Sequence, residues 1–495
     1  MSTKATIFDL GEVDLRRPNV DIIEELALSL REEFPERYCN PRNRHALATI
    51  NSTRKTFRAQ ETCWCERVVR ASVRRSSDGA VLELGLGNEF SDACSAAELE
   101  ANPDFRKWKK AASVIRWQEY VDSIRAVLID LQDIGWYLPL AAVTSLRAEP
   151  PIIHNGATRV RGYPRNLSSL VRKPIRRADA SVVGVKAAWS GAVPENVSTL
   201  LAYGGSPLFS GSPKFRAAHV KDEIPASIIL LPDRKQLRPD DDEIGLISEC
   251  ERRGERFAVC KVGSLSNEFA RANILFGLAM ALGAVPWTTP LKRERVISAL
   301  DAGHNAAARK SRWAIAQYRT DNCELDVRVR DGALEENLDD FLSDEGLSID
   351  PACRELWRDG KLHARDRGLI TQRFQSDGVV ELVKHPDVAL FRGSLASPDP
   401  PEAGDAVVGP DGSVLLQNSP ASRNAGYHAP VRARTDDYDI AMLCDDLLAL
   451  TCRPTRSLYH LSSLPAPVYF ADRASKLSLT GWLKAVGNGW RLPPV

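Results

Sequence analysis

The pattern of apolar and polar positions predicts alternating strands and helices in the middle of the chain. Two apolar runs, at residues 226–233 and 256–262, are each followed by a longer stretch, at residues 241–254 and 267–284. The first long stretch begins with acids and ends on Gly, and the second is almost wholly apolar. Strand, helix, strand and helix at this spacing are typical of a parallel, doubly wound α/β sheet.

A second series of strands begins after residue 290 and follows an RNase H-like order. Its first strand ends in an acid, Asp301, and a hairpin and a helix complete the series. The predicted strands are residues 294–304, 311–320, 323–332, 354–360 and 379–393; the helices are residues 334–345 and 437–452, and the hairpin is residues 405–419. We therefore predict a Rossmann-like α/β domain over residues 176–290 and an RNase H-like domain over residues 291–495.

The first 175 residues are rich in Arg and Trp and contain no recognisable motif. Between Arg106 and Asp133 the apolar residues recur three to four positions apart. This spacing predicts an amphipathic helix with one buried face. We assign residues 1–175 to an N-terminal α+β region of unknown role.

Composition limits the functional classes only weakly. The 495 residues include 66 Lys and Arg against 65 Asp and Glu, so a net charge of +1 gives no overall signal for nucleic acid, and any basic surface must be local. The N-terminus has charges where a signal peptide needs an apolar run, and no apolar stretch is long enough to span a membrane. We expect a cytoplasmic protein without membrane contact.

The ten cysteines are scattered along the chain, and Cys63 and Cys65 form the closest pair. One Cys-x-Cys without a second pair is a weak zinc signal. We expect ordinary reduced cysteines.

One local basic segment lies at residues 159–177, with seven basic residues and no acid. It could be a solvated linker. It could also contact a nucleic-acid backbone, for which clustered Arg beside Tyr is suitable, with Arg172 and Lys173 as candidate ligands.

The most specific sequence signal is residues 450–476, LTCRPTRSLYHLSSLPAPVYFADRASK. This segment resembles the end of the Argonaute PIWI domain. The Gly-x-x-Pro-Trp at residues 283–287 likewise resembles the exit of an Argonaute MID domain. The resemblance covers roughly residues 225–480 and implies a MID domain at 176–290 and a PIWI domain at 291–495. The chain length, without a readable PAZ domain, is similar to that of short prokaryotic Argonautes.

The resemblance implies a cutting site made of acids, since RNase H chemistry uses carboxylates that converge on two divalent metals. Asp301 occupies the position of the first acid. Arg-Asp-Gly, which carries the second, occurs twice, at Asp331 and Asp359. Only Asp359 leaves room for the helix that precedes the fourth strand, although either Asp-Gly could also be a plain tight turn.

Alignment with the family places Arg432 at the last acid position. An arginine cannot ligate a metal. His428 and Asp436 would each need a shift of register, and Glu335 and Glu336 are not assignable as the mobile glutamate of active members. We therefore expect vestigial acids at Asp301 and Asp359 and a site that does not cut.

The resemblance also implies a pocket for the 5′ phosphate of a guide strand, lined by Lys, Gln and Tyr. Here the expected Lys positions are Ala281 and Gly277, and the Gln position falls near Ala258. Asp242 and Leu246 stand where Tyr and Lys are expected. The candidate substitutes are Lys261, Arg271 and Asn273, of which Lys261 could equally be a surface lysine.

In the C-terminal segment, Thr455, Arg456 and Ser457 match the family Thr-Arg-Ser and could hold a backbone phosphate or simply cap the segment. The terminal carboxylate, here that of Val495, helps to coordinate a metal at the guide end in many relatives. The resemblance thus implies a possible Mg²⁺ there and no other cofactor.

The sequence leads to three hypotheses. The first is a nuclease-inactive Argonaute that recognises target RNA or DNA through a guide and acts in prokaryotic defence against plasmids or phages with a separate effector protein. The second is an active guide-dependent endonuclease that uses Asp301, Asp359 and a third acid that our alignment misplaces. The third is a degenerate scaffold that binds no guide.

Overall fold

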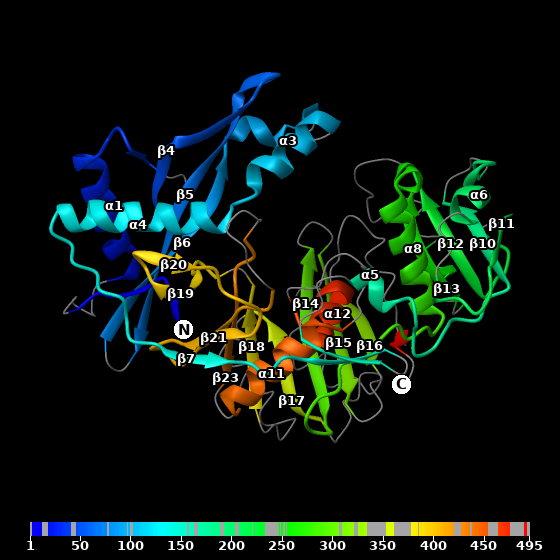
Figure 1. Ribbon diagram of the computed structural model, residues 1–495. Coiled ribbons are helices and arrows are strands. Elements are labelled where there is room, and N and C mark those ends of the chain that lie inside the picture. The colour runs from blue at the N-terminus through cyan, green and yellow to red at the C-terminus, as the bar shows by residue number, and fades with distance from the viewer. Residues whose placement is uncertain are drawn as a thin grey trace. The chain divides into compact units, whose positions relative to one another are not determined.

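The chain was analysed as a computed structural model (Figure 1). It describes residues 2–11, 18–40, 46–76, 79–96, 98–99, 102–155, 158–162, 167–188, 193–202, 207–219, 221–232, 247, 249–250, 253, 255–305, 309–320, 325–333, 353–360, 378–384, 386–419, 427–435, 438–453, 464–475 and 490–492. Its contacts divide the chain into two units: unit 1 is Met1–Glu149 with Val383–Arg434, and unit 2 is Pro150–Leu382 with Thr435–Val495. Domain boundaries at residues 175 and 290 remain predictions.

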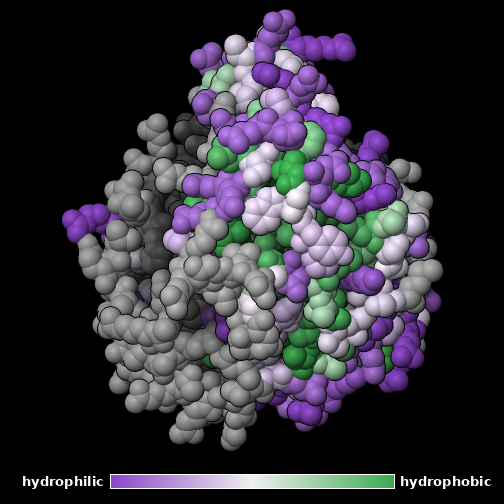
Figure 2. All heavy atoms as spheres, turned by 90° about the vertical axis from the view of Figure 1, so that its left-hand side faces the viewer, coloured by the Kyte–Doolittle hydropathy of each residue, from purple (hydrophilic) through white to green (hydrophobic). Residues whose placement is uncertain are grey.

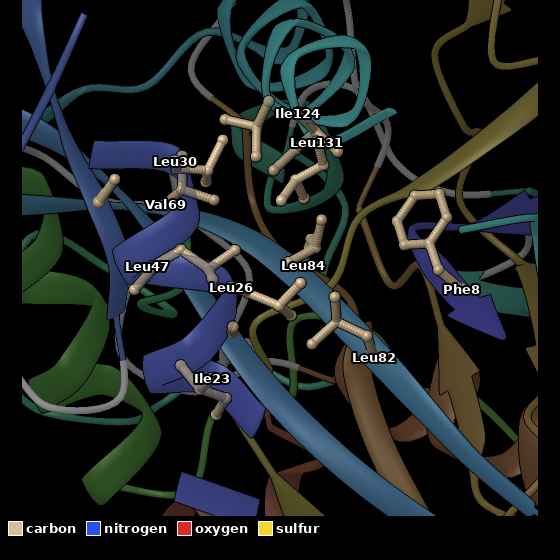
Figure 3. Close-up of a cluster of buried hydrophobic side chains, with 14 of the residues drawn as sticks. Phe8, Ile23, Leu26, Leu30, Leu47, Val69, Leu82, Leu84, Ile124 and Leu131 are labelled. Atoms are coloured by element: carbon tan, nitrogen blue, oxygen red, sulfur yellow. The ribbon is translucent and has the colours of Figure 1, made fainter. Parts of the chain in front are cut away.

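Unit 1 is built on a five-stranded sheet of order β2-β6-β5-β4-β3, covered by two helices (Figure 1). The strands are β2 (Ile7–Asp9), β3 (Tyr38–Cys39), β4 (Ala46–Phe57), β5 (Gln60–Ser76) and β6 (Gly79–Phe90); the helices are α1 (Asn19–Glu33) and α4 (Trp117–Asp133). Apolar residues of both helices meet alternate residues of the strands, as Figure 3 shows for Leu26, Leu30, Leu84, Ile124 and Leu131. Removing these side chains from water is the main stabilising contribution to this layer.

Two further sets of hydrogen-bonded strands complete unit 1. One has the order β1-β19-β20, and the other contains β23, β22, β21 and β7 in that order. Their strands are β1 (Thr3–Ala5), β7 (Thr144–Arg147), β19 (Leu390–Ser394), β20 (Ser397–Asp399), β21 (Asp405–Val408), β22 (Val414–Leu416) and β23 (Val431–Thr435). The predicted hairpin at residues 405–419 is confirmed as β21 and β22.

The predicted helix at residues 106–133 is two helices, α3 (Pro103–Ser113) and α4. Val114 between them is extended, with φ −71° and ψ 117°. The buried Arg67 donates hydrogen bonds to the carbonyls of Ala112 and Val114, both at 2.8 Å. The helix ends here because these carbonyls bond to a distant side chain, which helical periodicity cannot reveal.

The cysteine prediction is wrong for two residues: Cys63 forms a disulfide with Cys94, which lies in the short helix η1 (Asp92–Ser95). The pair lies in an apolar cluster with Phe57 and Phe105. Cys39, Cys65, Cys250, Cys260, Cys444 and Cys452 form no disulfide, in agreement with the prediction for these six residues.

Figure 2 shows one face of the molecule, on which hydrophilic residues predominate at the upper, projecting end and hydrophobic residues gather in the middle.

Unit 2 contains the predicted parallel sheet, of order β11-β10-β12-β13. The strands are β10 (Val182–Ala187), β11 (Lys214–Ala218), β12 (Ala226–Leu231) and β13 (Arg256–Lys261), and the helices are α5 (Leu167–Leu170), α6 (Val197–Ala202), η2 (Val262–Ser266) and α8 (Glu268–Ala281). Predicted strands 226–233 and 256–262 and helix 267–284 are confirmed. The hairpin of β8 (Ile152–Asn155) and β9 (Thr158–Arg161) precedes this sheet.

The second set of hydrogen-bonded strands in unit 2 has the order β24-β16-β15-β14-β17-β18. β14 to β16 pair antiparallel, and β17 and β18 continue the sheet in parallel with β14. The elements are β14 (Val296–Asn305), β15 (Lys310–Arg319), β16 (Leu325–Ala333), β17 (Cys353–Asp359), β18 (Gly378–Val383), β24 (Trp490–Leu492), α11 (Ile440–Thr451) and α12 (Ala466–Ser475). This order confirms the RNase H-like prediction; the predicted helix at 334–345 lies outside the described residues.

Candidate functional site

Two parallel strands bring the first pair of predicted acids side by side at the point where the pairing of the strands ends. The prediction that the first strand ends at Asp301 is wrong, because β14 continues to Asn305. β14 and β17 are aligned so that Leu300 is opposite Arg358. Asp301 and Asp359 directly follow these partners, so they occupy equivalent positions on neighbouring strands. Gly360 then adopts φ +90°, a conformation that favours glycine, where the strand ends. Arg-Asp-Gly is here both a turn and the carrier of an acid beside Asp301.

The other Arg-Asp-Gly lies farther from β14. Asp331 is on β16 and pairs with Arg312 of β15, so one whole strand separates its backbone from β14. Strand order thus distinguishes two identical tripeptides.

A third acid, Asp472, comes from α12, which packs against β14 and β15. Asp472 is buried, and its charge acts on Asp301. Burial raises the pKa of Asp301 to about 6; hydrogen bonds from Ser475 and the Ala302 N–H oppose the rise, whereas the charges of Asp472 and Asp359 add to it. Asp301 therefore lies within electrostatic range of two other carboxylates.

The chemistry of these three side chains suits a hard divalent cation. Mg²⁺ and Mn²⁺ prefer carboxylate oxygens, and a cation would offset the mutual repulsion that helps to raise the pKa of Asp301. Among the described residues, however, no three Asp, Glu, His or Cys side chains are placed so that they could together hold a metal ion. The three carboxylates thus suit a divalent cation by their ligand type and by the strand register that places Asp301 and Asp359 side by side.

Arg432 makes a different contact from the one that our alignment suggested. It lies on β23 in unit 1, is buried, and donates from Nη2 to Glu83 Oε1 at 2.6 Å. Since Asp472 supplies an acid beside Asp301, we correct the alignment: Arg432 does not replace the third acid. His428, just before β23, is exposed. Asp436, Glu335 and Glu336 lie outside the described residues.

Sequence reasoning missed Asp472 although it lies in the segment that carried the resemblance. The signal was present, because Asp472 is the only acid in the largely apolar stretch from Leu464 to Ser475. A buried acid on such a helix face normally has a specific partner. Ser475 gave no sequence signal.

The predicted guide-end residues lie around the start of α8. Lys261 ends β13, and Arg271 and Asn273 are on the helix, all three partly buried. Arg271 Nη1 donates to the Leu265 carbonyl at 2.6 Å, which ties the helix to η2. Arg271 therefore has a structural contact that a ligand would have to share.

The amide groups at the start of α8 are also engaged. The Asn267 side chain accepts hydrogen bonds from the N–H groups of Phe269 and Ala270, at 2.9 and 3.2 Å. A helix N-terminus can bind a phosphate through such groups. Here the cap would have to be displaced first.

The other predicted strand-binding residues are only partly covered by the structure. Arg172 and Lys173 are exposed in the turn after α5. Thr455, Arg456, Ser457 and Val495 lie outside the described residues, as do Asp242 and Leu246, so their roles remain predictions.

Within the described chain, none of the helices has the length and apolar character to cross a membrane.

No family model matches the sequence, and no curated protein matches it. Solved structures do. A structure of Clostridium butyricum Argonaute bound to a guide DNA and a 19-mer target DNA matches with TM-score 0.70 and 9% identity, over 98% of this chain and 88% of that one. Drosophila Piwi matches with TM-score 0.62 and 12% identity, over 96% and 88%.

A structure of Marinitoga piezophila Argonaute with a 5′ OH guide RNA and target DNA matches with TM-score 0.61 and 10% identity, over 94% of this chain and 85% of that one. At such identities the likeness establishes the fold alone. The chain has the fold of the Argonaute and Piwi proteins, which confirms the predicted resemblance.

Proposed function

We propose that this protein binds a guide strand and uses it to recognise a complementary nucleic acid. The observation that carries the proposal is the fold match over almost the whole chain to an Argonaute bound to both guide and target. The locally basic segment with exposed Arg172 and Lys173 is consistent with backbone contact.

We further propose that the bound target is cleaved, which is the second hypothesis drawn from the sequence. The expectation of an inactive site depended on Arg432 and on a mobile glutamate that could not be assigned, and Asp472 removes the first of these reasons. Asp301, Asp359 and Asp472 would hold the divalent cations, which supply Lewis-acid chemistry and a nucleophilic water when bound. The chain's own contribution is to fix the carboxylates on two paired strands, within β14 and at the end of β17, and on one buried helix.

The test is a cleavage assay with labelled RNA and DNA targets, RNA and DNA guides, and Mg²⁺ or Mn²⁺. We expect guide-dependent cleavage that is lost in Asp301→Asn, Asp359→Asn and Asp472→Asn. Asp331→Asn is the matched control, because it alters the other Arg-Asp-Gly, two strands away from β14, and we expect it to cleave normally. Guide-dependent binding without cleavage would return us to the inactive hypothesis; failure to bind any oligonucleotide at low salt would favour the scaffold.

The separate effector, the role in defence against plasmids or phages and the cytoplasmic location remain predictions. Mg²⁺ at Val495 is likewise a prediction. Affinity capture of the full chain would test the effector and the defence role together. The bound proteins would be identified, and the bound oligonucleotides would be sequenced.

A further inference from the structure

Ser475, the last residue of α12, makes a contact that neither the fold nor the proposed function requires. Its side chain is buried, and Oγ donates to Asp301 Oδ2 at 2.9 Å. Oγ also lies 3.1 Å from the carbonyl oxygen of Asp472, one helical turn earlier. A hydroxyl has one hydrogen, so these two acceptors compete for it. The charged acceptor gives the stronger bond, which favours the carboxylate of Asp301.

The other oxygen of Asp301 is held as well. Oδ1 accepts the backbone N–H of Ala302 at 2.9 Å. Because each oxygen accepts one hydrogen bond, rotation of the carboxylate about the Cβ–Cγ bond of Asp301 would break both hydrogen bonds. Each oxygen still has a lone pair that faces no donor in these two contacts. The carboxylate is thereby fixed in direction and can still accept a ligand.

We propose that Ser475 is a positioning residue that orients the Asp301 carboxylate for a divalent cation. The inference rests on the proposed cleavage function, since it concerns the same carboxylate. Asp472 and Ser475 are three positions apart on α12 and so share one face of the helix. Helix α12 therefore supplies both the acid Asp472 and the hydroxyl of Ser475 that orients Asp301. The packing of α12 against β14 determines the positions of both side chains.

The test measures Mn²⁺ binding to the full-length protein by isothermal titration calorimetry, which does not require turnover. We expect Ser475→Ala to weaken Mn²⁺ binding about tenfold, the lower range for removing a residue that supports a metal ligand. Ser475→Thr keeps the hydroxyl and should retain most of the affinity. In cleavage assays, Ser475→Ala should need more Mn²⁺ for half-maximal rate, and saturating Mn²⁺ should restore most of the rate.

Thr451→Val is the matched control. Thr451 is the buried last residue of α11, and its hydroxyl donates to the backbone carbonyl of Leu447 at 2.7 Å and not to a carboxylate. This variant removes a buried hydroxyl at a comparable position, so it should lower stability without changing Mn²⁺ affinity. Thermal unfolding of all variants verifies that each is folded.

The outcomes separate the inference from its premise. If Asp301→Asn abolishes Mn²⁺ binding while Ser475→Ala binds like the unaltered protein, the positioning role is wrong and the metal site stands. If Asp301→Asn binds Mn²⁺ unchanged, the proposed metal site is wrong, and the role of Ser475 with it. Equal loss in Ser475→Ala and Thr451→Val would show a general structural effect and also overturn the inference.

Discussion

Arg432 shows how far a residue's role depends on its partner. Its guanidinium bonds to Glu83, which also accepts the Ser72 hydroxyl at 2.9 Å and Arg74 Nε at 3.2 Å. Both Arg432 and Glu83 are almost fully buried. Removing one member of such a pair leaves a buried charge with fewer partners, whereas removing an exposed pair costs little.

Arg432→Met should therefore lower the free energy of unfolding by about 3 kcal/mol, the low end for a broken buried pair, since Arg74 remains beside Glu83. Arg432→Asp, which restores an acid at the aligned position, should destabilise further by placing two carboxylates together, without raising Mn²⁺ affinity. Urea unfolding and calorimetry measure the two effects. Arg125→Met, which removes an exposed pair with Asp122, is the control. Tighter Mn²⁺ binding by Arg432→Asp would contradict our corrected alignment.

For individual residues, the sequence predicted the acids that belong to recognisable motifs. It did not predict the side-chain pairings that depend on tertiary contacts. Asp301 and Asp359 were identifiable because strand order selects between the two Arg-Asp-Gly copies. Arg432 and Glu83 are 349 positions apart, so no local pattern could reveal their pairing. Asp472 lies in the segment at residues 450–476 that carried the resemblance. Our alignment sought the last acid before the final helices, whereas it lies on the helix α12.

At the element scale, the predicted helices at residues 267–284 and 437–452 were correct, as were the predicted strands of unit 2 up to residue 360, because each of these apolar runs matches one helix or strand. The single strand predicted at residues 379–393 was wrong: this run forms two strands, β18 and β19, which belong to different sheets. Helix boundaries were less predictable. The break between α3 and α4 depends on Arg67, and the start of α8 depends on the Asn267 cap. Both are set by side-chain bonds to backbone groups.

Helix α8 gives a prediction about guide selection. With the first amides capped by Asn267, and Gly277 and Ala281 where lysines are expected, we expect the protein to bind 5′-phosphorylated and 5′-hydroxyl guides with similar affinity. A Cβ at Gly277 meets nothing within 4 Å, so a side chain fits there. Gly277→Lys should then favour the 5′-phosphorylated guide by about tenfold, the effect of one charge-assisted hydrogen bond of about 1.5 kcal/mol.

Fluorescence anisotropy with matched labelled guides measures this ratio. Gly277→Ala controls for the gain in helix propensity and should leave the ratio unchanged. A strong 5′-phosphate preference in the unaltered protein would show that Lys261 or Asn273 already binds the phosphate. No gain in Gly277→Lys would show that our alignment of α8 with the guide end is wrong.

At the scale of the whole molecule, unit 1 is built from two distant parts of the chain, which the sequence did not indicate. Ile7 and Val81 share an apolar cluster with Leu390, Val407 and Leu415. The Trp117 ring nitrogen also donates to the Leu390 carbonyl, at 3.4 Å. Apolar runs predict individual strands, but which runs share a core depends on packing between segments far apart in the sequence.

This arrangement predicts which fragment folds alone. Residues 1–149 by themselves would expose the partners of Leu390, Val407 and Leu415, and each buried aliphatic side chain contributes about 1.5–3 kcal/mol. Losing three removes most of a typical stability of about 5–15 kcal/mol. We expect no cooperative thermal transition by circular dichroism for residues 1–149, and a clear one when residues 383–434 are joined to them by a flexible linker. The joined fragment with Leu390→Asp and Leu415→Asp is the control and should lose the transition. Equally cooperative unfolding of residues 1–149 with and without the second segment would mean that the N-terminal part is an independent domain.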